Sequence, residues 1–147
     1  MSLNALMMWW HKQKDRAILE KGNGLVVAIS KVLYFSKRQC KDKTKAFLNI
    51  GGYVPLEKVY ALEPVPEGVS EAQAANVLGA QGQLWTEYIP TTSYAEYMLF
   101  PRQCALAEVC WLPAKQKDFA DFSKRLNTHL LRLKQQGINY RDPAKGL

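Results

Sequence analysis

The residues of this sequence that could do chemistry are aromatic and acidic. Trp85 and Glu87 lie two residues apart at the end of an apolar segment, Val77 to Trp85. Two residues are one period of a β-strand, so the indole and the carboxylate would face the same side. Taken alone, the pair also fits a core tryptophan and a solvated glutamate. Trp10 and Tyr34 are further aromatic residues in apolar segments.

Other kinds of reactive site are not indicated. Neither His11 nor His129 has a serine, cysteine or metal-ligand partner at a telling spacing, and no two acidic residues are adjacent. The 3 cysteines are odd in number and form no CxxC motif, so neither a disulfide framework nor a zinc site is predicted. Cys104 and Cys110 are expected to be core thiols within an apolar helix. No cofactor is predicted.

Short apolar runs and two helical segments must position these side chains. We expect strands near residues 3–10, 25–29 and 77–85, because runs of this length are typical of strands buried on both faces. We expect helices near 93–111 and 116–136, the second with apolar residues at spacings of three and four. Strands that alternate with helices indicate a parallel sheet with helices outside it, in the α/β class.

Local signals add detail to these elements. Pro101 lies inside the first long helical segment and should kink it or begin a new first turn. Ser70 followed by Gln73 matches a capping box and predicts a short helix. Gly79 and Gly82, in the third strand, fit a crowded barrel corner or the close approach of a ligand.

Composition limits the class of partner. The 147 residues are enough for one domain, and 48% hydrophobic with 22% charged residues is ordinary for a globular protein. No apolar run approaches the roughly 18 residues of a membrane span. The net charge of +7 would suit nucleic acid, but the basic residues are spread out and follow no helix-turn-helix or zinc-finger spacing. We therefore expect solvated basic surfaces, with neither a nucleic acid nor a membrane partner.

Several longer motifs point to one family. The segment from Val77 to Ala107 contains GAQGQLWTEYI, then EYMLFPR, then ALAEVCW. Further stretches in the same order are MMWW near the start, YF at 34–35, IGGYVPLEKVYALEPVP at 50–66 and GINYR at 137–141. Together these motifs resemble glycoside hydrolase family 20, the β-N-acetylhexosaminidases, over nearly the whole chain. The resemblance implies a (β/α)₈ TIM barrel, which takes about 250 residues. The chain, residues 1–147, would be a single C-terminal fragment of it, carrying the last three strand-helix units.

The resemblance also implies roles for individual residues. Trp10 and Trp85 would line the sugar pocket, Glu87 would accept hydrogen bonds from sugar hydroxyls, and the hydroxyl of Tyr34 would bind the acetamido carbonyl. In this family the substrate's own 2-acetamido group is the nucleophile, and the reaction retains the anomeric configuration. The substrate would be a terminal, non-reducing N-acetylhexosamine of a glycan.

Two features depart from the family. The catalytic Asp-Glu pair, expected in an HxGGDE-like motif after the fourth strand, has no counterpart here, so the chain alone is expected to be inactive. Ser36 stands where the family usually has an aspartate for a sugar hydroxyl, and His11 stands where it often has an arginine.

A different function class stays open. A non-catalytic carbohydrate-binding or structural module could keep the aromatic residues Trp10, Tyr34 and Trp85 without cleaving sugar. Three parallel strands cut from a barrel would expose sheet edges, so we expect self-association of the isolated chain. A parent enzyme of bacterial origin is expected to be periplasmic, secreted or at the cell surface.

Overall fold

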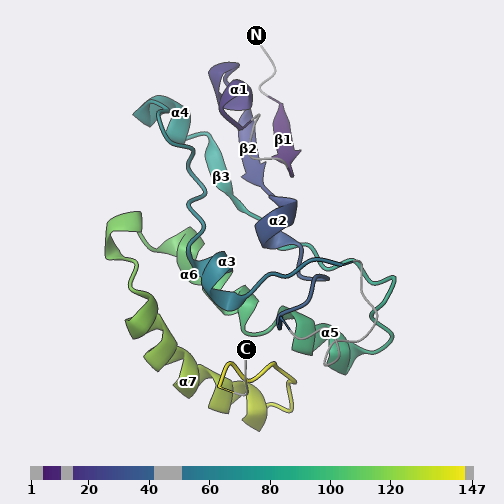
Figure 1. Cartoon of the computed structure of the whole chain (residues 1–147). Helices are drawn as coiled ribbons and strands as arrows, with labels where there is room; N and C mark the ends of the chain where they lie inside the picture. Colours follow the sequence, from purple (N-terminus) through teal and green to yellow (C-terminus); the bar gives the residue numbers. More distant parts are fainter. Residues whose placement is uncertain (1–4, 11–14, 42–50, 145–147) are drawn as a thin grey trace.

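A three-stranded parallel sheet organises the molecule. The computed structural model describes residues 5–10, 15–41 and 51–144. Its strands are β1 (Leu6–Trp9), β2 (Gly24–Val27) and β3 (Val77–Ala80), hydrogen-bonded in the order β1-β2-β3 (Figure 1). The expected α/β class with parallel strands is therefore confirmed. Each strand is shorter than the apolar run that contains it.

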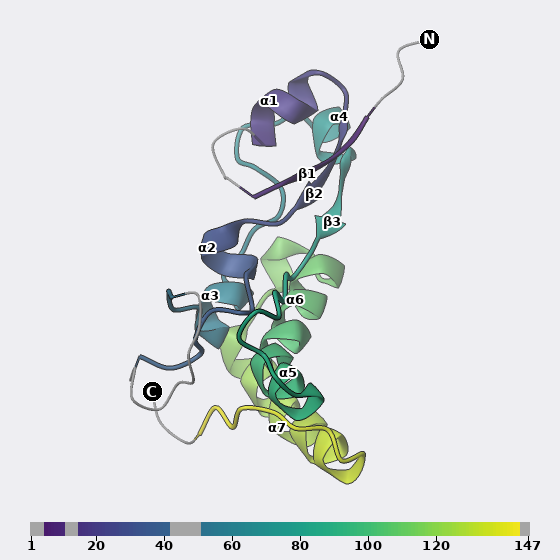
Figure 2. The ribbon, with the colours of Figure 1, turned by 90° about the vertical axis from the view of Figure 1, so that its right-hand side faces the viewer.

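The helices fill the connections and the second half of the chain. They are α1 (Asp15–Glu20), α2 (Ser30–Leu33), α3 (Leu56–Tyr60), α4 (Glu71–Ala74), α5 (Thr92–Leu99), α6 (Arg102–Trp111) and α7 (Phe119–Gln135), with a 3₁₀ turn at Ala114–Gln116. Pro101 separates α5 from α6, so the expected long helix is two helices joined at this proline. α1 and α4 lie at the end of the molecule opposite α5 and α7 (Figures 1 and 2).

Side-chain caps explain where two of the helices begin. The capping box expected before α4 is present: Ser70 Oγ accepts from Gln73 N at 3.3 Å, and Gln73 Oε1 accepts from Ser70 N at 2.8 Å. The carboxylate of Asp118 caps α7 by accepting from Ala120 N and Asp121 N. These bonds satisfy backbone donors that the first helical turn leaves free.

Within the described residues, the core lies on one face of the sheet. Leu25 and Val27 of β2 are buried with apolar residues of α3, α6 and α7. On the other face Leu6 of β1 and Leu78 of β3 are 66% and 64% exposed. A sheet of parallel strands normally has both faces covered. The face that carries Leu6 and Leu78, which we call the open face, is therefore a surface that other protein would cover in a complete barrel.

Gly79 and Gly82 shape the third strand. The register shifts between Leu25↔Val77 and Val26↔Gly79, and Gly79 has φ +142°, a conformation that side chains rarely adopt. At Gly82 a Cβ atom would lie 2.6 Å from the ring of Phe35. The expected crowding is thus present at Gly82, and the neighbour that causes it is Phe35.

Cys110 corrects one expectation. It lies near the end of α6 and is exposed, because the apolar residues of that helix face α3 and α7 while this position faces outward. Cys104 is partly buried, and burial raises the pKa of its thiol to about 11. Among the described residues, no helix is long and apolar enough to cross a membrane.

Candidate functional site

The carboxyl ends of the strands are held together by backbone hydrogen bonds beyond the strands themselves. Ala28 N donates to Trp9 O at 2.9 Å and Ser30 N donates to Trp10 O at 3.1 Å. On the other side of β2, Phe35 N donates to Gln83 O and Gln83 N donates to Leu33 O, both at 2.7 Å. The segments after β1, β2 and β3 are therefore positioned relative to one another. All four predicted site residues lie in these segments.

Tyr34 and Trp85 are brought together at this end. Tyr34 is bridged to Gln83 in parallel register, and the rings of Tyr34 and Trp85 lie 6.3 Å apart between centroids at an interplanar angle of 47°. This spacing is within the range of a tilted aromatic pair. Trp85 remains 47% exposed, so the pair presents aromatic surface to solvent rather than filling the core.

Trp10 and Glu87 lie at the same end, in the segments after β1 and β3. Trp10 is 46% exposed, whereas its neighbour Trp9 packs against the core. Residues alternate along β1 between exposed and partly buried, so Trp10 lies on the open side of the sheet. Glu87 is exposed and has no ion pair within the described residues. The structure thus makes one aromatic contact and leaves two further predicted groups accessible nearby.

We call the surface that carries Trp10, Tyr34, Trp85 and Glu87 the wall. Ser36 and Lys37 follow Tyr34 in it. Ser36 is 4% exposed, and its buried Oγ has no hydrogen-bond partner among the described residues. The ammonium of Lys37 lies 5.6 Å from the centroid of the Tyr34 ring and donates to Ser30 O at 2.7 Å. Burial, and then the charges of Lys58 and Lys31, lower the pKa of Lys37. His11 lies outside the described residues.

Arg102 anchors the segment after Tyr34 by hydrogen bonds to its backbone. It was not predicted as a site residue. It is completely buried, and its guanidinium donates to Lys37 O at 2.9 Å, to Val54 O at 3.1 Å, and to the carbonyl oxygens of Phe35 and Met98. Its Cζ lies 4.9 Å from the centroid of the Phe35 ring. Burial, with a smaller contribution from Arg141, lowers the pKa of Arg102 to about 9. The sequence does contain a signal that could have pointed to Arg102, namely an arginine directly after a helix-breaking proline in an apolar segment.

Gln39 adds a second link to the same wall. It is 3% exposed, and its Nε2 donates to Tyr97 O at 2.5 Å and to the carbonyls of Met98 and Phe100. Arg102 and Gln39 together fix residues 35–39 against the end of α5. The backbone that carries Tyr34 is therefore anchored on both sides, by β3 and by α5.

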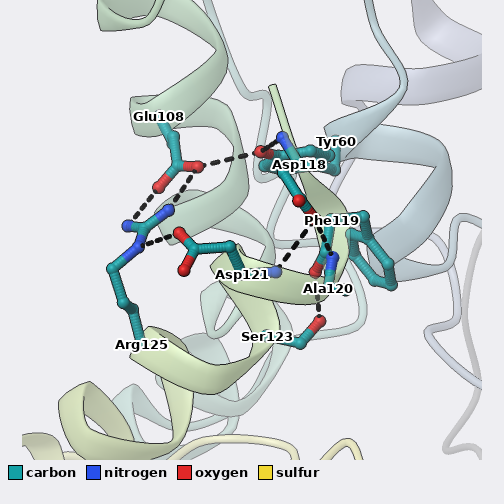
Figure 3. A network of polar contacts seen from close by, with 8 residues as sticks. All are labelled: Tyr60, Glu108, Asp118, Phe119, Ala120, Asp121, Ser123 and Arg125. Atoms are coloured by element: carbon teal, nitrogen blue, oxygen red, sulfur yellow. Dashed lines mark hydrogen bonds and ion pairs between the residues drawn. The ribbon is translucent and has the colours of Figure 1, made fainter. Parts of the chain in front are cut away.

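A separate polar network joins α3, α6 and α7 (Figure 3). Arg125 binds Glu108 through two hydrogen bonds of 2.7 and 2.8 Å, and Tyr60 Oη donates to Glu108 Oε1 at 2.9 Å. The hydrogen bond from Arg125 holds the pKa of Glu108 below its usual range, although burial acts against it. Burial and the Glu108 hydrogen bond raise the pKa of Tyr60. Because every charge here has a partner, the network favours a structural role.

A groove between α6 and α7 has a volume of about 1100 Å³. Glu108, Trp111 and Arg125 are among its lining residues, and none of the four predicted site residues lines it. The predicted wall is open to solvent instead of enclosed. We place the candidate site at the wall, because its residues follow three neighbouring strands and Tyr34 pairs there with Trp85.

Comparison with known proteins gives a consistent match. The model of the family "Glycosyl hydrolase family 20, catalytic domain" matches residues 1–114. A beta-hexosaminidase of Porphyromonas gingivalis is 46% identical over 102 residues, which are 69% of this chain and 13% of that protein. A beta-hexosaminidase of Akkermansia muciniphila is 32% identical over 126 residues, or 82% of this chain and 24% of that protein. The chain thus spans a quarter or less of these two relatives.

Solved structures agree with the family match. An exo β-N-acetylglucosaminidase of Vibrio harveyi, solved with N-acetylglucosamine, superposes with a TM-score of 0.86 at 31% identity, over 95% of this chain and 22% of that one. A β-N-acetylhexosaminidase of Streptomyces coelicolor gives a TM-score of 0.81 at 26% identity, over 99% of this chain and 31% of that one. The expected partial barrel is confirmed by these superpositions together with the three parallel strands.

Proposed function

The chain belongs to the catalytic domains of glycosyl hydrolase family 20, and from this premise we propose that it forms the sugar-facing wall of a β-N-acetylhexosaminidase site. The observation that carries the proposal is the placement of Trp10, Tyr34, Trp85 and Glu87 after three neighbouring parallel strands. In barrel enzymes the active site lies at this end of the strands. The whole protein would hydrolyse terminal, non-reducing N-acetylhexosamine residues of glycans.

Each proposed role follows from the chemistry of the group. A sugar ring and an acetamido methyl present apolar faces, which the exposed indoles of Trp10 and Trp85 suit. The hydroxyl of Tyr34 would bind the acetamido carbonyl and hold its oxygen for attack on the anomeric carbon, which raises the rate by fixing a near-attack geometry. The Glu87 carboxylate would accept hydrogen bonds from sugar hydroxyls.

Cleavage needs two further groups. The leaving oxygen must receive a proton from an acid within hydrogen-bond reach, and a second carboxylate must orient the acetamido nitrogen. The HxGGDE-like motif that carries this pair in the family does not occur in the sequence. We therefore expect no turnover of a chromogenic N-acetylglucosaminide by the purified chain. Turnover above the background of a mock purification that lacks the chain would contradict this part of the proposal.

Sugar binding tests the wall directly. N-acetylglucosamine should change the tryptophan fluorescence of the chain in the millimolar range, since part of a pocket binds weakly; a dissociation constant of about 1 mM is about 4 kcal/mol. Trp85→Phe should remove most of that response. Trp111→Phe is the matched control, because Trp111 is 89% exposed at the end of α6, and it should keep the response. A flat titration, or equal loss in both variants, would count against the wall.

A non-catalytic carbohydrate-binding module is the second candidate. It is favoured by the combination of an accessible aromatic pair with the missing acid pair. The two candidate functions predict different sequences for the whole protein that contains the chain. The gene sequence upstream of Met1 decides between them, because an in-frame HxGGDE-like motif supports the enzyme and its absence supports the module.

A further inference from the structure

The segment after α7, residues 138–141, lies beyond residues 1–114, which the family model matches. It runs back to α5, the helix whose end also anchors the backbone after Tyr34 (Figure 2). Part of the chain outside the matched residues is therefore placed where it can act on the sugar-facing residues.

Asn139 ties this segment to α5. Its backbone N donates to Glu96 Oε2 at 2.8 Å, and its side-chain Nδ2 donates to Ser93 O and Ser93 Oγ at 3.0 and 3.1 Å. Ser93 and Glu96 are three residues apart in α5, so they lie on one face of the helix. Asn139 therefore holds one face of α5.

Gln39 ties the same helix to the wall. Its Nε2 lies 2.5 Å from Tyr97 O and 3.3 Å from the carbonyl oxygens of Met98 and Phe100, and the residue is buried. Carbonyl groups in the last turn of a helix have no partner within the helix, so they need a donor from elsewhere in the chain. The end of α5 thus sets the position of Gln39, which follows Tyr34 closely in the sequence.

The carbonyl group of Phe100 is shared by the two segments. Its oxygen lies 3.3 Å from Gln39 Nε2, and Arg141 N donates to it at 3.2 Å. One carbonyl group thus joins residues 138–141 to the segment that carries Tyr34. A displacement of residues 138–141 would move α5 and this carbonyl group, and with them the anchor of Gln39.

We propose, on the basis of the proposed function, that Asn139 and Gln39 are positioning residues for sugar binding that act through α5. Asn139 holds α5, α5 holds Gln39, and Gln39 holds the backbone that places Tyr34 beside Trp85. Groups that bind a ligand keep their geometry only when the residues behind them are also held. Loosening either link should therefore weaken sugar binding while Tyr34 and Trp85 stay in the chain.

Asn139→Ala tests the link that is remote from the wall. It removes the two Nδ2 hydrogen bonds at an exposed position, so the variant should fold. The dissociation constant for N-acetylglucosamine, followed by tryptophan fluorescence, should rise about two- to fivefold, within the net effect of one hydrogen bond. Asn127→Ala, at an exposed asparagine of α7, is the matched control and should leave the constant unchanged.

Glu96 gives an independent check with a rescue. Glu96→Ala removes the acceptor for Asn139 N and should weaken binding to a similar extent, whereas Glu96→Gln keeps an acceptor oxygen and should restore the affinity. The indole signal of Trp85 in a ¹H–¹⁵N spectrum without sugar should move in Glu96→Ala and return in Glu96→Gln. A merely structural role would lower stability in urea and leave both the affinity and this signal unchanged.

A double-mutant cycle tests whether the effect passes through Gln39. Gln39→Ala should weaken binding at least as much as Asn139→Ala, and the double variant should bind about as weakly as Gln39→Ala alone. Fold-changes that multiply would mean that the two residues act independently, which would overturn the proposal. If Gln39→Ala does not fold, the results for Asn139 and Glu96 decide the proposal.

The remaining outcomes separate these positioning roles from the proposed function. If the parent chain binds sugar through Trp85 and Asn139→Ala binds it equally well, the positioning roles are excluded and the proposed function stands. If the parent chain binds no sugar, the wall is excluded as a sugar site and the positioning roles are excluded with it.

Discussion

Arg102 is a buried cation whose hydrogen-bond partners are all main-chain carbonyl oxygens. These carbonyls belong to residues on both sides of Ser36, to Val54 and to Met98. A guanidinium can reach several oxygens at once because its five N–H donors are arranged in a rigid fork. The residue acts on the proposed sugar-facing wall through the backbone of residues 35 and 37, so we assign it a positioning role.

Truncation of Arg102 should therefore be strongly destabilising. Arg102→Ala leaves these carbonyls buried without donors, and we expect a loss of about 3–5 kcal/mol in the free energy of unfolding. Urea denaturation measures this loss. Arg132→Ala, at an exposed arginine of α7, should change stability by less than about 0.5 kcal/mol. Similar small effects for both variants would show that Arg102 does not hold the wall.

At this scale the sequence offers signals for ligand-facing residues but not for supporting ones. Trp85 and Glu87 were predicted from a strand period and a motif, and they stay a prediction, since β3 ends at Ala80, before both residues. Arg102 could not be predicted, because its role depends on carbonyl oxygens from residues 35, 37 and 54, which are brought together only by folding. Cys110 was misjudged for a related reason: the local sequence is apolar on average, and only packing decides which positions face outward.

At the scale of elements, Gly82 sets the distance between the segments after β2 and β3. Gly82→Ala would place a methyl group 2.6 Å from the Phe35 ring. We expect it to cost about 1–3 kcal/mol, the usual range for overpacking. Phe35→Leu in the same chain should recover part of that cost, so a double-mutant cycle should give a nonzero coupling energy. Additive effects in the cycle would mean that this contact does not set the spacing.

The network of α3, α6 and α7 should make stability depend on acidity. The pKa of Glu108 in the folded chain lies below its usual value of 4.5, so its stabilising effect is present above that pH and is lost as the pH falls through the folded-state pKa. Unfolding of the chain should therefore become easier below about pH 4.5, and Glu108→Gln should show a shallower dependence there.

The same variant should also be less stable at neutral pH, by about 1–2 kcal/mol, because the charged hydrogen bonds to Arg125 are weakened. Urea denaturation between pH 3 and 7 would give both quantities. Glu71→Gln, at an exposed carboxylate of α4, gives the background slope. An acid slope in Glu108→Gln equal to that of the parent chain would exclude Glu108 as its source.

Element types follow from the sequence more readily than element limits. Apolar runs indicated all three strands, but each strand is only four residues long. The register of β3 shifts before Gly79, and β2 is followed closely by α2. The capping signal at Ser70 was sufficient to place α4, since both partners of a capping box are local in the sequence. Pairing between strands is a long-range property and was not available from the local pattern.

In the described part of the chain, one face of the sheet has no cover. Leu6, Met8 and Leu78 are exposed on the open face, and β1 and β3 are the edge strands of the described sheet. The isolated chain should self-associate, because exposed edges and apolar surface favour further pairing. Sedimentation velocity at working concentration should show species larger than a monomer.

A pair of variants locates that association. Leu78→Glu should shift the chain toward monomer, because it places a charge on the open face. Leu131→Glu is the control: Leu131 is 61% exposed, close to the 64% of Leu78, but lies on α7. It should leave the distribution unchanged. A parent chain that sediments as a monomer, or an equal effect of both variants, would contradict the expectation.

A titration followed at the indole N–H groups tests whether a sugar-facing wall lies at the strand ends. The chain has 4 tryptophans, so a ¹H–¹⁵N spectrum gives one indole signal for each. Addition of N-acetylglucosamine should shift the signals of Trp10 and Trp85 and leave that of Trp111 in place. Shifts confined to Trp111, or no shift at any indole at a sugar concentration well above the millimolar range, would show that the strand ends do not form a sugar-facing wall.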